Sequence, residues 1–183
     1  MRSLPLATAL AITATTAMAA DTQQYDFDDF NAVEVSAGIS VTIERGEDYS
    51  VEAEAKRGRL RRLEITQSGN TLDIDRRTSW GILGLGRRDR FEVTITLPEL
   101  EFAKASSGSS MDISGQFDDD LGLEASSGAS MSFGGTVSDD LEIDASSGAS
   151  VSAHNLNIQD LTVEATSGAS VSFRLLRQHR RRS

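Results

Sequence analysis

The chain has 183 residues, of which 38% are hydrophobic, and its formal net charge is −10. That length suits one domain, or two small ones, with a real core, and the negative charge argues against general nucleic-acid binding, which relies on a basic surface. The sequence contains no cysteine and only two histidines. This excludes disulfide scaffolds, thiolate chemistry and thiolate zinc sites, and it leaves little room for histidine-based catalysis.

The first 19 residues have the pattern of a secretory signal peptide. Arg2 carries a positive charge, an uncharged and mostly apolar stretch follows, and Ala17-Met18-Ala19 supplies small residues where a signal peptidase reads. The stretch is too short and too rich in threonine for a membrane span, although a short buried helix is an alternative. We expect a Sec signal at residues 1–19, cut after Ala19 or Ala20. The mature protein would be soluble and exported to the periplasm, the outer-membrane surface or the extracellular space.

The N-terminal half of the mature chain is strand-like but irregular. After an N-terminal segment at residues 20–30, residues 34–43 align without gaps on residues 164–173 of the C-terminal half. Further runs with the apolar alternation of strands lie at residues 49–55, 63–66, 71–74 and 91–97. Pro98 closes this half.

A loop at residues 78–90 is the most conspicuous irregularity. It contains the only tryptophan, several large apolar residues, three glycines and a basic flank. Exposed, it would bind a partner or a lipid surface; folded inward, it would cover an open end of the strand array. Its glycines are not followed by Lys-Ser/Thr, so it is not a phosphate loop. The candidate partner-binding residues here are Trp80, Ile82, Leu83, Leu85, Arg87 and Arg88.

From residue 105 the chain repeats with a period of 20. Ala-Ser-Ser-Gly begins at residues 105, 125 and 145, and Ala-Thr-Ser-Gly begins at residue 165. Apolar and polar residues alternate on both sides of each tetrapeptide, and glycine suits a tight turn because it accepts positive φ. A fixed period near 20 indicates a solenoid. We predict an all-β fold: a single-domain parallel β-helix or β-solenoid with coils of about 20 residues, spanning residues 31–173.

Acidic residues also follow the repeat. Residues 105–173 contain no Lys or Arg, and a register of 20 would stack Asp120, Asp140 and Asp160. A divalent cation would relieve the repulsion within such a column. The simpler interpretation is turn chemistry beside a solvated face, because no calcium-binding glycine-aspartate nonapeptide is present. We expect no cofactor, and these three aspartates are the only metal candidates.

A hydroxyl ladder is predicted on the outward side of the second strand of each repeat. It comprises Ser130/Ser132, Ser150/Ser152, Ser170/Ser172 and, near the start of the domain, Ser40/Thr42. Such an array is similar to the surfaces of ice-binding β-helices, although those favour threonine. Glycan binding is another alternative, although aromatic platforms are lacking. The simplest interpretation is that serine is a small, soluble residue for a crowded face.

Enzymatic activity is the alternative from a different class. Some exported β-helices are polysaccharide lyases or hydrolases, and paired carboxylates are the minimum for glycoside hydrolysis. Here, however, the acids follow the repeat instead of clustering once, and no nucleophile elbow accompanies the serines. We therefore expect a non-enzymatic protein without catalytic residues.

A basic tail follows at residues 174–183. It could bind anionic envelope lipid or polysaccharide, fold back on the acidic repeats, or be disordered. Leu175 and Leu176 would help its first turn to dock. The candidate binding residues of the tail are Arg174, Arg177, Arg180, Arg181 and Arg182.

Three features occur in a characteristic order: residues 30–43, the strand and proline of residues 93–98, and the Ser-Gly-Ala-Ser repeats. On these features the chain resembles the putative auto-transporter adhesin, head GIN domain family, over about residues 27–173. The resemblance implies a parallel β-helix-like fold in bacterial envelope or secreted proteins, without established enzymatic activity. A further strand or closing turn would be expected after Phe173, where this chain has the arginine tail. We expect an interaction or structural module whose partner is an envelope protein or a surface polysaccharide.

Overall fold

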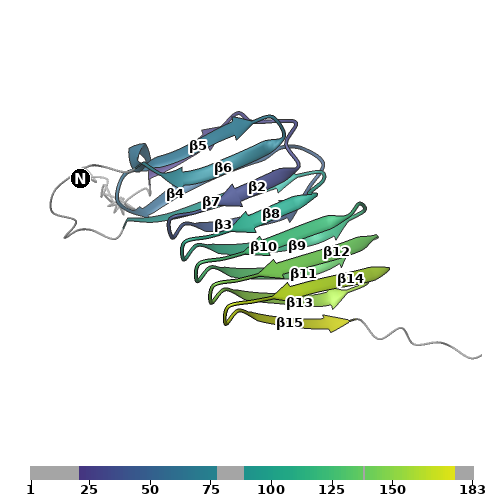
Figure 1. Ribbon diagram of the computed structural model, residues 1–183. Helices are drawn as coiled ribbons and strands as arrows, with labels where there is room; N and C mark the ends of the chain where they lie inside the picture. The colour runs from purple at the N-terminus through teal and green to yellow at the C-terminus, as the bar shows by residue number, and fades with distance from the viewer. Residues whose placement is uncertain (1–20, 78–88, 138, 176–183) are drawn as a thin grey trace, which may run out of the picture.

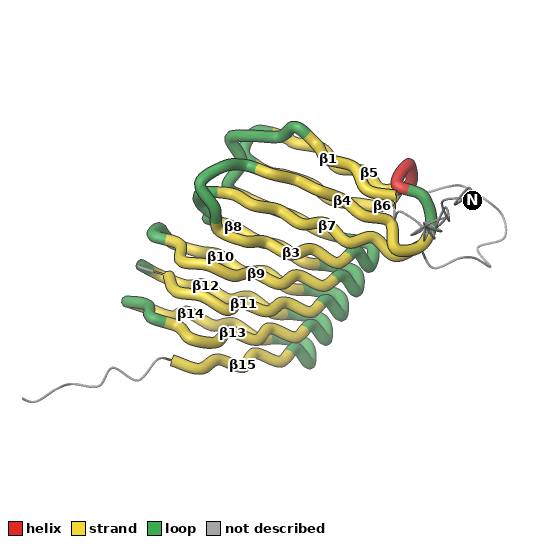
Figure 2. The backbone as a smooth tube through the Cα atoms, turned by 180° about the vertical axis from the view of Figure 1, so that it is seen from behind, coloured by secondary structure: helices red, strands yellow, loops and turns green. Residues whose placement is uncertain are grey.

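The computed structural model describes residues 21–77, 89–137 and 139–175. Within these ranges the chain is all-β, with fifteen strands in two sheets and one short 3-10 helix, η1 (Leu60–Arg62). The two sheets lie face to face, as Figures 1 and 2 show from opposite sides. The all-β class predicted from the alternation pattern is thereby confirmed.

We call the eight-stranded sheet A and the seven-stranded sheet B. Sheet A contains, in spatial order, β1 (Asp21–Tyr25), β4 (Ser50–Arg57), β7 (Arg90–Leu97), β3 (Ser40–Arg45), β9 (Ser110–Phe117), β11 (Ser130–Val137), β13 (Ser150–Leu156) and β15 (Ser170–Leu175). Sheet B contains, in spatial order, β14 (Asp160–Ala165), β12 (Asp140–Ala145), β10 (Leu121–Ala125), β8 (Phe102–Ala105), β2 (Ala32–Val35), β6 (Thr71–Arg76) and β5 (Leu63–Ser68).

From β8 onward, successive strands alternate between the two sheets and pair in parallel with the equivalent strand of the next repeat. In sheet B, Leu121 is the register partner of Leu141, which in turn partners Leu161. In sheet A, Met131 partners both Met111 and Val151. The period of 20 in the sequence is therefore the register of strand pairing, as predicted.

The N-terminal end is mixed instead of purely parallel, which corrects the parallel arrangement predicted for the whole of residues 31–173. Strands β1 and β7 both pair antiparallel with β4, and β5 pairs antiparallel with β6. Only Gly69 and Asn70 separate β5 from β6, and a two-residue connection joins antiparallel neighbours but is too short for a parallel crossover.

The core lies between the sheets and consists of inward-facing residues of the strands from β2 to β13. In each repeat the alternation places three such positions on the sheet B strand, for example Leu121, Leu123 and Ala125, which are all fully buried. Met131 and Phe133 of β11, in sheet A, are also buried in this core. The centroid of the Phe133 ring lies 6.4 Å from the centroid of the Phe117 ring. One continuous apolar column therefore runs through the repeats.

The Ser-Ser-Gly corners are β-turns that stack on one another. In the second repeat, Ala129 N donates to Ser126 O at 3.0 Å, and the two central residues both have positive φ: 50° at Ser127 and 72° at Gly128. This is the backbone of a type I′ turn. Gly128 N also donates to Ser147 O of the next turn at 3.1 Å. Stacked backbone hydrogen bonds thus continue the sheet ladders around the corner.

Candidate functional site

Many of the residues singled out from the sequence fall outside the described ranges. This applies to the signal peptide at residues 1–19 and to the side chains Trp80, Ile82, Leu83, Leu85, Arg87, Arg88, Arg177, Arg180, Arg181 and Arg182. Arg174 is the described member of the arginine tail, and it is exposed near the end of β15. The described surface carries four further regions with the polar or charged side chains that a binding site needs.

The three aspartates considered for a cation lie at the starts of three neighbouring strands of sheet B, namely β10, β12 and β14. Asp140 and Asp160 are register partners, and the backbone N–H of Asp140 donates to Asp120 Oδ1 at 3.1 Å. The Asp120 carboxylate thus bonds the backbone at the start of the next strand. Among the described residues, no group of three or more His, Asp or Glu side chains is arranged to hold a metal ion.

The outer face of sheet A carries two hydroxyl-rich columns, which we call the serine face. The first column contains Ser40, Ser110, Ser130, Ser150 and Ser170, and the second contains Thr42, Asp112, Ser132, Ser152 and Ser172. A shallow groove of about 510 Å³ crosses four successive strands here, β9, β11, β13 and β15. Ser110 and Asp112 were not predicted as members of the ladder, although the period of 20 locates both of them.

The outer face of sheet B has the opposite character, and we call its central line of side chains the acidic column. In register it contains Asp73, Glu34, Lys104, Glu124, Asp144 and Glu164. Lys104 Nζ lies 2.9 Å from Glu124 Oε1, and this hydrogen bond raises the pKa of Lys104 above its ordinary value. The two outer faces of the same repeats thus differ in charge: hydroxyls dominate one and carboxylates the other.

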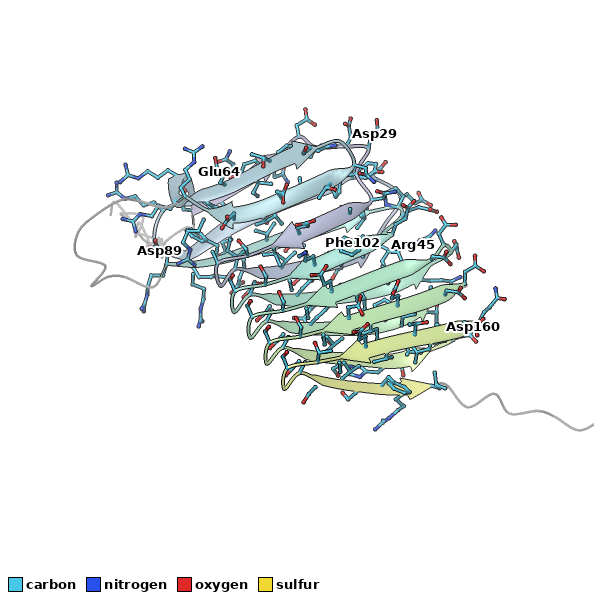
Figure 3. The ribbon with its side chains drawn as sticks, viewed as in Figure 1. Asp29, Arg45, Glu64, Asp89, Phe102 and Asp160 are labelled. Atoms are coloured by element: carbon cyan, nitrogen blue, oxygen red, sulfur yellow. The ribbon has the colours of Figure 1, made fainter. Side chains whose placement is uncertain are left out.

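A further surface lies where β4 passes into η1, at the N-terminal end of the stack. Arg57, Arg59, Arg61 and Arg62 line a pocket of about 560 Å³ together with Asp89. The Asp89 side chain is buried, and Arg62 Nη1 donates to its Oδ2 at 2.8 Å. Figure 3 shows Asp89 at this end, with basic side chains projecting outward around it. This pocket was not predicted from the sequence, because the basic residues at positions 56–62 were interpreted only as a connection between two strands.

Gly58 sits against the buried carboxylate of this pocket. Its φ is +106°, and a Cβ there would overlap the carboxylate of Asp89. Only glycine tolerates both the backbone conformation and the close approach. The local sequence Arg-Gly-Arg therefore allows β4 to turn closely around Asp89, while the flanking arginines remain at the pocket surface.

These surfaces belong to an all-β protein made of two facing sheets of repeated strands. Over residues 29–177 the sequence matches the family described as putative auto-transporter adhesin, head GIN domain. Since the match spans most of the chain, the protein belongs to that family.

Several solved structures of bacterial proteins are similar to this chain. A putative adhesin from Bacteroides fragilis is 11% identical, has a TM-score of 0.48, and aligns over 87% of this chain and 98% of its own. A putative lipid binding protein from Parabacteroides distasonis is 10% identical, has a TM-score of 0.47, and aligns over 85% and 96%. A putative adhesin from Parabacteroides merdae is 16% identical, has a TM-score of 0.41, and aligns over 83% and 95%.

One further comparison and one structural search are negative. No curated protein matches the sequence. Within the described ranges, no helix has the length and apolar character needed to cross a membrane.

Proposed function

We propose that the protein is an exported, non-enzymatic β-solenoid that serves as an adhesin-like interaction module of the bacterial cell envelope. In this proposal the chain consists of a signal peptide at residues 1–19, a short segment at 20–30, a solenoid domain at 31–173 and a basic tail at 174–183. Its ligand is an extended envelope polysaccharide bound along the serine face. The family description supports the adhesin-like role, and the groove on sheet A is the observation that carries the choice of ligand.

The chemistry of the serine face suits a polymer of hydroxyl groups. A serine hydroxyl both donates and accepts hydrogen bonds, as sugar hydroxyls do. Serines of neighbouring strands are register partners, so their hydroxyls recur at the strand spacing of about 4.8 Å. A repeated array of this kind offers the same contacts to successive units of an extended chain.

The contrast between the two sheets favours sheet A over sheet B as the binding surface. The acidic column would repel the anionic polysaccharides that are common in envelopes, whereas the serine face has Asp112 as the one carboxylate within its two columns. Its groove also runs across the strands, along the direction in which the repeats stack. A bound polymer would therefore follow the long axis of the domain.

A binding experiment on matched variants tests the proposal. The double variant Ser132→Gln/Ser152→Gln fills the groove with larger side chains of unchanged charge, and Glu142→Gln alters the outer face of sheet B as the control. Co-sedimentation with polysaccharide extracted from the producing cells should show at least about tenfold weaker binding for the double variant, a loss of about 1.4 kcal/mol. The control should bind like the wild type. Equal binding by all three proteins, or wild-type protein retained in the cytoplasm after cell fractionation, would contradict the proposal.

A further inference from the structure

The two ends of the stack differ in how the apolar interior stops. At the C-terminal end, β14 and β15 are the outermost strands of their sheets and have a neighbouring strand on one side only. Their inward apolar residues are open to solvent: Val163 is 37% exposed, Phe173 51% and Leu175 54%. The register partners of these three residues in the preceding repeat, Ile143, Ala153 and Leu156, are at most 1% exposed.

The N-terminal end of the same interior is covered. Strand β1 adds an edge made of polar residues, and the backbone N–H of Leu60 in η1 donates to Asp21 Oδ2 at 3.3 Å. Phe30, Leu60 and Leu63 are all buried there. The repeated core is therefore closed at one end and open at the other within the described ranges, and an exposed apolar end with two free strand edges is a site for strand addition.

We propose that a second copy of this chain covers the open end, C-terminal end against C-terminal end, in a two-fold symmetric dimer. In this arrangement β15 of each copy pairs antiparallel with β14 of the other. Figure 1 shows that β14 and β15 run in opposite directions in the two sheets. A two-fold axis parallel to the strands, passing between the sheets, therefore brings each strand beside an oppositely directed partner.

The sequences of the two strands fit each other in this orientation. If Val171 pairs with Val163 of the second copy, Phe173 falls opposite Leu161, and both apolar pairs face the interior. The same register places Ser172 opposite Thr162 on the outer surface. It also places Arg174 opposite Asp160, and the symmetry repeats this ion pair on the other side of the dimer. Apolar, hydroxyl and charged positions all match without a shift of register.

A second copy of this chain is favoured over other partners because the open C-terminal end of the stack is complementary to itself. A two-fold contact uses the open ends of both copies, and the closed N-terminal ends then face outward, so assembly stops at two chains instead of continuing into fibres. The arrangement has a consequence that rests on the proposed function: the serine faces of the two copies point in opposite directions, so one dimer would bridge two polysaccharide layers. Dimerisation itself does not depend on the ligand.

Analytical ultracentrifugation of the full mature chain, and of variants that exchange the charges of Arg174 and Asp160, tests the proposal. Wild type should sediment with twice the mass of one chain at micromolar concentration. Phe173→Lys should be monomeric, and Arg174→Asp or Asp160→Arg should each weaken the dimer at least about tenfold, because each opposes like charges across the interface. The double variant Arg174→Asp/Asp160→Arg restores opposite charges in both pairs and should recover the dimer.

Two controls show whether this contact holds the dimer together. Because Phe173 and Arg174 are exposed in the single chain, their variants should keep the wild-type far-ultraviolet spectrum and melting temperature when compared as monomers. Gln23→Lys, on the edge strand of the closed end, should leave the dimer unchanged. A wild type that is monomeric at every concentration, as it would be if residues 176–183 covered the end, overturns the proposal. So does a dimer or longer polymer that is insensitive to the charge swap.

Discussion

Individual glycines set the spacing between strands where two backbones approach closely. A Cβ built on Gly135 of β11 would overlap the carbonyl oxygen of Gly115 in the neighbouring strand β9. The preceding residue, Gly134, faces solvent, and a Cβ there would meet nothing within 4 Å. The two adjacent glycines therefore have different roles, and sequence alone could not distinguish them because both fit a strand that tolerates small residues.

The Gly135→Ala substitution should destabilise the protein by about 1–3 kcal/mol, because the added methyl group forces β9 and β11 apart. Gly134→Ala is the matched control and should change the free energy of unfolding by less than about 0.5 kcal/mol. Urea denaturation of the two variants measures the difference. Similar stabilities for both would show that the close approach at Gly135 relaxes without cost.

The backbone conformation of the Ser-Ser-Gly turns was predicted only in part. The sequence predicted positive φ for the glycine of each Ser-Ser-Gly turn, and all four repeat glycines have it. It did not predict positive φ for the preceding serine, such as Ser107 at 52° or Ser147 at 50°. Serine is unusual in this conformation, and backbone hydrogen bonds between neighbouring turns of the stack support it.

Strands were predicted correctly where their sequences alternate apolar and polar residues, and they were missed where the sequences do not. The repeats gave the correct pairing register because the inward positions of their strands are apolar. Strand β1 was missed because its sequence, Asp-Thr-Gln-Gln-Tyr, has no buried position and is held by backbone pairing with β4. The basic pocket was missed for a related reason: Arg62 and Asp89 come together only through the pairing of the N-terminal strands, which no sequence period encodes.

Lys104 provides a test of the charge arrangement on sheet B. It lies in register between Glu34 and Glu124, so Lys104→Met should lower stability by about 0.5–1 kcal/mol at low salt, and less at high salt where the ion pair is screened. Lys104→Arg keeps the charge and serves as the control. The measurement is urea unfolding of the three proteins at two ionic strengths.

The pH dependence of this effect has a definite sign. The hydrogen bond to Glu124 raises the pKa of Lys104 in the folded protein, so the native state holds the lysine proton more tightly than the unfolded chain does. The stabilising contribution is therefore fully present below the unfolded pKa of about 10.4 and is lost as the pH rises through the higher folded pKa. A stability difference between wild type and Lys104→Met that grew above this range would contradict the assignment.

The molecule as a whole is asymmetric in two ways. The outer faces of the sheets differ in charge, and the ends of the stack differ in closure. The sequence predicted the serine ladder and the stack of Asp120, Asp140 and Asp160, because both follow the period of 20. It did not predict that Asp112 joins the serine face, nor which end of the apolar interior is open, because these depend on how strands outside the repeat pair with it.

Thiol protection shows directly whether polysaccharide binds along the serine face of sheet A. The chain has no cysteine, so Ser132→Cys and Glu142→Cys each introduce one reporter, on the outer faces of sheet A and sheet B. Maleimide labelling is measured with and without envelope polysaccharide. If polysaccharide occupies the serine face, the Ser132→Cys variant should be labelled at least about tenfold more slowly in its presence, corresponding to predominantly occupied sites, and the labelling rate of Glu142→Cys should be unchanged. Protection of the Glu142→Cys variant alone, or no protection of either, would contradict it.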